Sequence, residues 1–347
     1  MASALIMVPS TRRAIANASA DLPLQVGPAM IRASGNAGDA TKGLSGEGGT
    51  AMGGGMSYVL TLVADRRATS LTPATIDRMR VAVGGADVPR VLADGEAAEF
   101  RVWQKPDLGV ARAALEGAPI DVLCTRARGR RRGLLVADMD STIVTGETLD
   151  ELAAFAGLGE KIAAITRLSM DGKIDFREAL RERVAMLKGL ELGALEKTWA
   201  RTQLSAGART LVATMRKHGA LTALVSGGFT FFTARVAALC GFDHHRANVL
   251  LDDGVALTGG VAEPILASDT KLAALQELAT QRGVRMAATL AVGDGANDLP
   301  MLKAAGLGIA YRAKPVVAAE VENRIDHADL RALLFAQGYA AADFVRV

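Results

Sequence analysis

The sequence predicts an α/β protein in which a Rossmann-like parallel sheet, with helices on both faces, follows a small α+β domain. Three observations lead to this prediction. From residue 134 onward strand-like segments alternate with helical ones, which is typical of a parallel sheet covered by helices. The segments before residue 127 follow the order β-α-β-β-α-β. The chain has 347 residues, which is long for a single core and suits two domains.

Composition limits the classes of function. Half of the residues are apolar, and the net charge of +3 lacks the strong basic field of a dedicated nucleic-acid binder. No apolar run approaches the ~18 residues needed to cross a bilayer, and the N-terminal stretch lacks the order of a secretory signal. We therefore expect no nucleic-acid and no membrane partner. Cys124 and Cys240 stand apart without metal-binding spacing, which favours packing roles in a reducing cytoplasm.

The segment before residue 128 has two parts. Residues 1–55 end in a glycine-rich stretch that buries too little apolar surface to offset its ordering entropy, so we expect a disordered leader. Residues 56–127 carry the α+β pattern, and Thr72 with Pro73 marks the start of its first helix. This order is that of ACT-like regulatory domains, although other ferredoxin-like folds share it. An amino-acid effector at this domain and a homodimer both remain open. The expected strands are 58–64, 89–93, 98–103 and 120–127, and the expected helices 72–83 and 108–117.

An arginine-rich boundary, residues 128–133, follows this domain. It lies in the stretch RARGRRRG, which has five arginines in eight residues. A nucleic-acid patch is one interpretation, but no aromatic residues are interleaved. The pattern favours a solvated interdomain linker.

The segment from residue 134 to residue 340 predicts the parallel sheet. Its strand candidates are 134–138, 221–226, 288–294 and 307–311. About 80 residues of helical pattern separate the first two strands, too many for one crossover helix. We therefore expect a small helical cap at about residues 150–203.

Polar residues stand where three of these strands end, at the edge where open parallel sheets bind ligands. Each has an ordinary structural explanation: a helix cap, a glycine turn or, for Lys271 at the start of a later helix, a surface lysine. Their occurrence together in this order favours one site. The residues that follow the strands are Asp138 and Asp140, then Ser226 and Gly227, then Asp294, Asn297 and Asp298.

These residue types suit phosphoryl transfer with Mg²⁺. Carboxylates such as Asp138 and Asp294 are ligands that Mg²⁺ prefers, and Lys271 with Ser226 would offset phosphoryl charge in the transition state. A shielded phosphorus can then be attacked by a carboxylate, for which Asp138 is the candidate. Asp140 would protonate the leaving oxygen and later accept a proton from water. Its first task requires a protonated carboxyl, which a neighbouring carboxylate favours and a nearby Mg²⁺ opposes.

The motifs DMDST, VSGGF, Lys271 and GDGANDLPML resemble the four motifs of the haloacid dehalogenase-type phosphatase superfamily. Over residues 134–340 the pattern resembles its bacterial phosphoserine phosphatases, whose longer members also carry an N-terminal module. The resemblance implies that Asp138, the main-chain carbonyl of Asp140 and Asp294 bind the metal. Asp298 would support the metal side, and the implied phosphate contacts are Ser226, Gly227, Lys271 and Asn297.

The same resemblance implies how a substrate is chosen. Glu147 corresponds to the glutamate that holds the substrate ammonium. Arg183, in RVAMLKG, corresponds to the arginine that binds the substrate carboxylate, although a methionine replaces one leucine of the family pattern. Met170 and Phe176 correspond to apolar cap residues that close over the ligand. Without the resemblance, Glu147 would be an ordinary acid at a helix N-terminus and Arg183 a surface ion-pair partner.

The resulting expectation is a cytoplasmic, Mg²⁺-dependent enzyme that hydrolyses O-phospho-L-serine through an aspartyl-phosphate, the last step of serine biosynthesis in that family. A phosphatase or phosphotransferase acting on another small phosphomonoester is the nearest alternative. A non-enzymatic regulator, with residues 56–127 sensing an amino acid, is a more distant one. Asp140 argues against the regulator, because a protein that keeps its phosphoryl group has little use for an adjacent acid-base residue.

Overall fold

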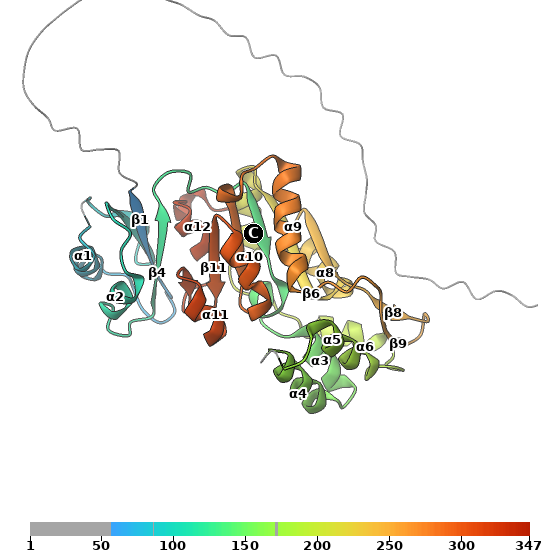
Figure 1. The fold of residues 1–347 in the computed structure, drawn as a ribbon. Coiled ribbons are helices and arrows are strands. Elements are labelled where there is room, and N and C mark those ends of the chain that lie inside the picture. The colour runs from blue at the N-terminus through green and yellow to red at the C-terminus, as the bar shows by residue number, and fades with distance from the viewer. Residues whose placement is uncertain (1–56, 86, 171–172) are drawn as a thin grey trace, which may run out of the picture. The chain divides into compact units, whose positions relative to one another are not determined.

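The structure is a computed structural model that describes residues 57–85, 87–170 and 173–347. The predicted leader, residues 1–55, lies outside the described residues. The described chain contains a four-stranded sheet, a six-stranded sheet and a two-stranded sheet, with helices between them (Figure 1).

The N-terminal module is an antiparallel sheet in the order β2-β3-β1-β4 with two helices on one face. Thr72 accepts a hydrogen bond from the backbone N–H of Thr75 at 3.2 Å and Pro73 follows it, so the first helix begins as its sequence predicts. The expected β-α-β-β-α-β order is present, and its identification as an ACT-like regulatory domain stays a prediction. The elements are β1 (Tyr58–Ala64), α1 (Pro73–Ala82), β2 (Arg90–Ala93), β3 (Ala97–Val102), α2 (Leu108–Ala113) and β4 (Ile120–Arg126).

The central sheet has the order β12-β11-β10-β5-β6-β7, and every neighbouring pair is parallel. All four side chains of β5 are buried, and they alternate between two apolar cores: Leu135 and Ala137 belong to one, Leu134 and Val136 to the other. A strand buried on both faces requires helices on both sides, which confirms the predicted fold class. The strands are β5 (Leu134–Ala137), β6 (Leu221–Phe229), β7 (His244–Asn248), β10 (Thr289–Gly293), β11 (Leu307–Tyr311) and β12 (Arg324–Ile325).

Helices connect these strands. Between β5 and β6 lie four cap helices and then α7, and the remaining helices follow β6, β9, β10, β11 and β12 in turn. In Figure 1 the cap helices form one group beside β8 and β9. The cap helices are α3 (Thr148–Phe155), α4 (Gly159–Met170), α5 (Phe176–Ala185) and α6 (Gly193–Arg201). The others are α7 (Ala208–Lys217), α8 (Thr230–Cys240), α9 (Ser268–Arg282), α10 (Leu299–Ala304), α11 (Pro315–Glu320) and α12 (Ala332–Ala336).

A β-hairpin that the sequence pattern did not predict joins the cap. It consists of β8 (Leu250–Asp252) and β9 (Leu257–Val261), which pair antiparallel. The backbone N–H of Gly189 donates to the carbonyl of Leu257 at 2.8 Å, and the N–H of Leu257 donates to Leu190 at 2.9 Å. The hairpin therefore ties the segment between α5 and α6 of the cap to the chain that follows β7. Two edge strands were also missed, since β7 has the polar sequence HHRAN and β12 has only two residues.

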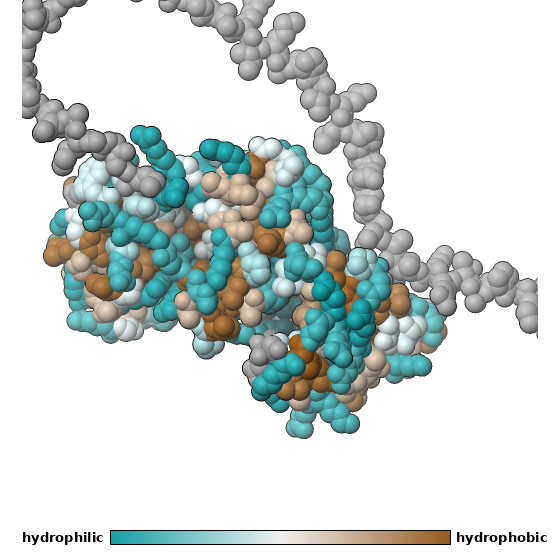
Figure 2. Space-filling view, in the orientation of Figure 1, coloured by the Kyte–Doolittle hydropathy of each residue, from teal (hydrophilic) through white to brown (hydrophobic). Residues whose placement is uncertain are grey.

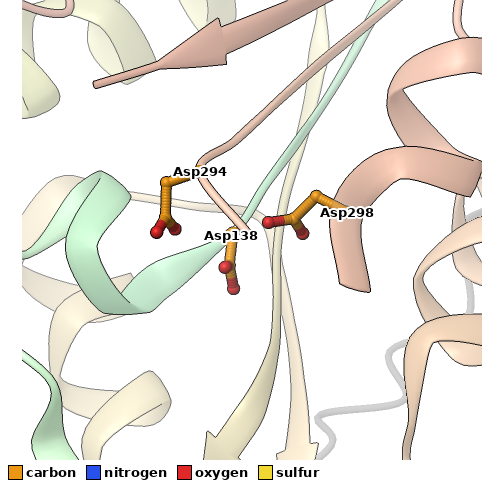
Figure 3. Close-up of side chains that lie close together, drawn as sticks. All are labelled: Asp138, Asp294 and Asp298. Atoms are coloured by element: carbon orange, nitrogen blue, oxygen red, sulfur yellow. The ribbon is translucent and has the colours of Figure 1, made fainter. Parts of the chain in front are cut away.

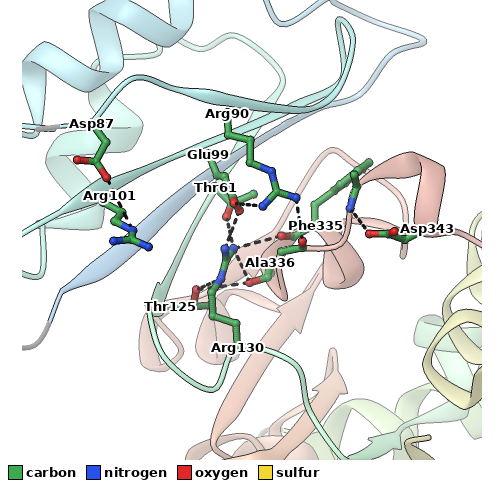
Figure 4. A network of polar contacts seen from close by, with 12 residues as sticks. Thr61, Asp87, Arg90, Glu99, Arg101, Thr125, Arg130, Phe335, Ala336 and Asp343 are labelled. Carbon is green, nitrogen blue, oxygen red and sulfur yellow. Dashed lines mark hydrogen bonds and ion pairs between the residues drawn. The ribbon is translucent and has the colours of Figure 1, made fainter. Parts of the chain in front are cut away.

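The arginine-rich boundary differs from the expected solvated linker. The side chain of Arg130 is only 11% exposed, and its Nη1 lies 2.7 Å from Oε2 of the buried Glu99 on β3 (Figure 4). Arg130 also donates to Thr125 Oγ1 at 3.1 Å and to the carbonyl of Ala336 at 3.1 Å, and Arg132 is buried as well. A carboxylate removed from water needs a cation beside it, so part of this linker is a structural contact between the N-terminal module and the part of the chain that contains the six-stranded sheet.

The surface in the view of Figure 2 is largely hydrophilic, with smaller hydrophobic patches between the polar residues. In the described part of the chain, no helix combines the length and apolar character required to cross a membrane.

Candidate active site

Three buried aspartates meet at the carboxyl ends of two neighbouring strands. Asp138 follows β5 and Asp294 follows β10, and these strands are parallel partners in the sheet. Asp298 comes from the turn after Asp294. Carboxylate oxygens of the three lie within 4.8 Å of one another, and the side chains converge in Figure 3. Because none of the three is more than 5% exposed, their charges require compensation.

Lys271, on the first turn of α9, provides part of that compensation. Its Nζ lies 2.7 Å from Asp138 Oδ1 and 2.6 Å from Asp298 Oδ1, and the residue is 2% exposed. Burial alone would lower the pKa of Lys271, but the two carboxylates raise it above its ordinary value. Lys271 is therefore a buried cation at the centre of the acidic group, and the surface-lysine explanation is wrong.

Asp140 lies where the chain leaves β5 in a tight turn. Ser141, the next residue, has a left-handed φ of 55°, which lets the chain reverse toward α3. Asp140 Oδ1 accepts a hydrogen bond from the backbone N–H of Thr148 at 3.0 Å, and the Ser226 hydroxyl donates to Oδ2 at 3.4 Å. Burial, followed by the negative charge of Glu147, raises the pKa of Asp140 to about 7. This carboxyl can exchange a proton near neutral pH.

Asp294 has its own set of contacts. Thr142 donates its hydroxyl to Asp294 Oδ1 at 3.3 Å, and Lys314 Nζ lies 3.8 Å from Oδ2. Burial and the charge of Asp298 raise the pKa of Asp294 to about 6, while Lys314 opposes that rise. Burial and Asp298 also raise the pKa of Asp138, which Lys271 opposes. The site therefore has more negative charge than its lysines neutralise.

Ser226 and Gly227 lie within β6, because this strand continues to Phe229, whereas the sequence predicted that it ends at Ser226. The ladder between β6 and β7 is interrupted from Val225 to Phe229, and this interruption turns the backbone toward the acids. Ser226 Oγ accepts the N–H of Gly228 at 2.8 Å. A Cβ on Gly228 would lie 2.8 Å from Asp140 Oδ2, so this glycine gives Asp140 its space.

A cavity of about 370 Å³ extends from these groups to the cap. Glu147 immediately precedes α3, and the Ser141 hydroxyl donates to its Oε1 at 2.7 Å. Arg183 on α5 is 8% exposed, and its Nη1 donates to Thr166 Oγ1 at 3.1 Å. A cationic and an anionic side chain from the cap side thus line the same cavity as the strand-end acids.

The remaining predicted site residues lie as follows. Phe176, at the start of α5, lies against Gly227, where an added Cβ would be 3.0 Å from its ring. Phe176, Gly227 and the half-buried Asn297 all line the cavity. Met170 ends α4, and its contact with a ligand stays a prediction.

The structure also brings in residues that the sequence did not single out. Ser141 and Thr142 stand inside the motif DMDST, but their roles depend on which side chains they contact across the turn. No sequence pattern near Thr166 marks it as a site residue. Its contact with Arg183 exists only because α4 and α5 pack together. Lys314 follows the strand β11, so the rule that ligands bind at strand ends could have identified it.

Comparison with known proteins agrees with this geometry. Residues 135–303 match the haloacid dehalogenase-like hydrolase family. A phosphoserine phosphatase of Streptococcus thermophilus is 46% identical over 200 residues, which are 57% of this chain and 93% of that protein. One from Archaeoglobus fulgidus is 41% identical over 201 residues, 58% of each chain.

A solved haloacid dehalogenase-family hydrolase from Salmonella enterica serovar Typhi superposes with a TM-score of 0.73 at 29% identity. That match covers 81% of this chain and 98% of the Salmonella chain, so the likeness extends beyond the central sheet. The chain belongs to the phosphoserine phosphatase family of the haloacid dehalogenase-like hydrolases.

Proposed function

We propose that this protein hydrolyses O-phospho-L-serine to L-serine and phosphate, the closing step of serine biosynthesis. The observation that carries the proposal is the distribution of charge in one cavity. Strand-end acids and Lys271 lie at its base, and Glu147 and Arg183 reach it from the cap side. A phosphoryl group at the base and an α-amino acid toward the cap would complement both ends.

The acidic base of the cavity suits Mg²⁺. Its donors are hard carboxylate oxygens, three of them within 4.8 Å of one another, and burial followed by the charges of neighbouring carboxylates raises the pKa values of Asp138, Asp140 and Asp294. Asp138, the main-chain carbonyl of Asp140 and Asp294 would hold the ion, with Asp298 and Asn297 in support. When bound, the ion would neutralise charge on the phosphoryl oxygens.

Asp138 is the proposed nucleophile. Lys271 and the backbone N–H of Met139 both contact its Oδ1, which fixes the direction of the carboxylate. In the first step an Asp138 oxygen bonds to phosphorus, the P–O bond to the serine side chain breaks, and the leaving oxygen takes the proton of Asp140. Lys271, the Ser226 hydroxyl and the N–H of Gly227 would stabilise the phosphoryl oxygens.

Asp140 is the proposed acid and base. In the second step a water oxygen bonds to phosphorus, Asp140 takes a proton from that water, and the P–O bond to Asp138 breaks. Because the pKa of Asp140 is raised to about 7, both protonation states are accessible near neutral pH. This property supports turnover and speaks against a regulator that retains its phosphoryl group.

Glu147 and Arg183 are the proposed selectors of the substrate. Glu147 would pair with the ammonium and Arg183 with the carboxylate of phosphoserine. Ser141 and Thr166 hold these two side chains through single hydrogen bonds. Phe176 and Met170 would cover the ligand from the cap. A phosphatase or phosphotransferase for another small phosphomonoester would share the base of the cavity but not need this pair.

A phosphate-release assay tests the proposal. Phosphoserine, phosphothreonine, phosphotyrosine and sugar phosphates are compared with Mg²⁺ and with EDTA. We expect phosphoserine to be preferred and EDTA to abolish release. Preference for a sugar phosphate would refute the roles of Glu147 and Arg183, and phosphate transfer to an added alcohol in place of water would favour the phosphotransferase.

Three wider predictions remain. The first is a homodimer, which sedimentation would test. The second is an amino-acid effector at the N-terminal module, which titration with serine would test. Buried free thiols at Cys124 and Cys240 support a cytoplasmic location.

A further inference from the structure

A second lysine lies at the edge of the cavity on a different strand. Strand β11 is the parallel neighbour of β10, with Ala310 beside Gly293, so the chain leaving β11 passes Asp294. Lys314 is on that chain, immediately before α11, and its backbone N–H donates to the carbonyl of Asp294 at 3.0 Å. The fold therefore places this lysine at the site through the backbone as well as the side chain.

The turn that carries Lys314 has an unusual backbone. Arg312 has a left-handed φ of 45°, a region that costs a residue with a side chain on the order of 1 kcal/mol. Its N–H donates to the carbonyl of Ile325 at 2.7 Å, and Pro315 fixes the start of α11 after the turn. The Arg312 contact holds the turn to β12, and the contact of the Lys314 N–H with the carbonyl of Asp294 holds it to the chain that follows β10.

Lys271 and Lys314 contact different aspartates of the site. Lys271 contacts Asp138 and Asp298 beneath the cavity, whereas Lys314 lies 3.8 Å from Asp294 Oδ2. The side chain of Lys314 is 37% exposed and lines the cavity, while that of Lys271 is 2% exposed. Among the described residues, Lys314 is thus the lysine whose side chain lines the cavity, while Lys271 lies behind the acids.

We propose that Lys314 is a binding residue of the phosphate subsite, whose ammonium attracts the phosphate group of the ligand past the surrounding carboxylates. The inference rests on the proposed function in taking a phosphomonoester as the ligand. A dianion approaching a group of aspartates is repelled, and a lysine at the entrance reduces that repulsion. The long, flexible lysine side chain can shift from a carboxylate to a phosphate without moving the backbone.

Inorganic phosphate is the probe, because it binds without turnover. Its affinity is measured by calorimetry at a Mg²⁺ concentration shown to saturate each variant. Lys314→Met should weaken phosphate binding about tenfold, the size expected for loss of one charged contact. Lys314→Arg keeps the positive charge, so its phosphate affinity should stay within about threefold of that of the original protein.

Lys303→Met is the matched control. Lys303 on α10 pairs with Glu320 on α11 at 2.8 Å and is exposed, so its loss removes a lysine contact to the same helix without changing the cavity. We expect unchanged phosphate affinity. Equal affinity in Lys314→Met and the original protein would overturn the proposal, as would equal losses in Lys314→Met and Lys303→Met. Failure of the proposed function would appear separately, as absent phosphoserine turnover by the unaltered protein.

Discussion

At the scale of single residues, the position of Asp140 depends on what surrounds it as much as on its own sequence position. The N–H of Thr148 and the hydroxyl of Ser226 contact its two oxygens, and Gly228 leaves the space beside it open. Burial, followed by the negative charge of Glu147, raises its pKa to about 7. A change at Ser226 or Gly228 should therefore affect proton transfer while Asp140 itself is kept.

Gly228→Ala tests this dependence. The new Cβ would lie 2.8 Å from Asp140 Oδ2 and 3.1 Å from Ser226 Oγ, so one of them must move. We expect kcat for phosphoserine to fall about 100-fold, the range lost when an acid-base group is misplaced. Gly193→Ala is the control, since nothing lies within 4 Å of its added Cβ. Equal kcat values for both variants would contradict the account.

The raised pKa values predict how metal binding depends on pH. Asp140 and Asp294 have ordinary values of 3.8 and reach about 7 and about 6 on folding. In the metal-free protein, these groups stabilise the fold below about pH 4, and that contribution is lost as the pH rises through 6 to 7. At Asp294, protons and Mg²⁺ would compete for the same carboxylate oxygens, whereas Asp140 would offer the ion its main-chain carbonyl and gains negative charge nearby when its carboxyl loses a proton.

The increase in melting temperature caused by Mg²⁺ should therefore be larger at about pH 8 than at about pH 5.5. The comparison uses the same protein with Mg²⁺ or EDTA at each pH. A stabilisation that is equal at both pH values, or greater at the acidic one, would show that the Asp294 carboxylate does not bind the ion.

At the scale of elements, the strand ends locate the acids and the cap helices locate the groups for the substrate. The central strands were predictable, because short apolar runs end in polar residues at the same edge of the sheet. The contact between Arg183 and Thr166 was not, because it depends on how α4 and α5 pack. The same holds for the hairpin β8–β9 and for the edge strand β7, whose polar sequence carries no strand pattern.

The cap arginine gives a prediction at this scale. Arg183→Ala should raise KM for phosphoserine at least tenfold with a smaller change in kcat, since the residue is proposed to bind carboxylate and not to move protons. Thr166→Val keeps the shape but removes the acceptor for Nη1, and should raise KM about fivefold.

Arg181→Ala is the control on the same helix. Arg181 is exposed, and its side chain pairs with Glu263, which lies outside α5. We therefore expect the KM of Arg181→Ala to be close to that of the original protein. A similar rise in KM for Arg181→Ala and Arg183→Ala would assign the effect to the stability of the cap and not to recognition of the substrate.

At the scale of the whole described chain, buried carboxylates attach the N-terminal module to the phosphatase-like part. Glu99 contacts Arg130, and Glu96 contacts Arg331 at 2.8 Å (Figure 4 shows the first). Asp121 on β4 accepts backbone N–H groups of residues 326–328, at 2.7 Å for Ala328. The sequence pattern suggested a boundary here, but it could not show that acids of one domain satisfy the backbone of the other.

Asp121→Asn tests this attachment. One carboxylate oxygen becomes an N–H₂ that faces backbone donors, which should lower the free energy of unfolding by about 1–3 kcal/mol. Chemical denaturation measures the change. Asp87→Asn is the control, because Asp87 is 45% exposed and its Arg101 partner lies 3.7 Å away. Equal free energies of unfolding for Asp121→Asn and Asp87→Asn would show that the Asp121 contacts do not stabilise the fold.

The central claim is that phosphoserine turnover passes through a phosphoryl group on Asp138. The most direct measurement is rapid acid quench with phosphoserine labelled in its phosphoryl group, followed by peptide mapping. We predict transient label on the peptide that contains Asp138, with neither label nor turnover in Asp138→Asn. Turnover in that variant, or turnover of the original protein with label found only on another residue, would contradict the mechanism.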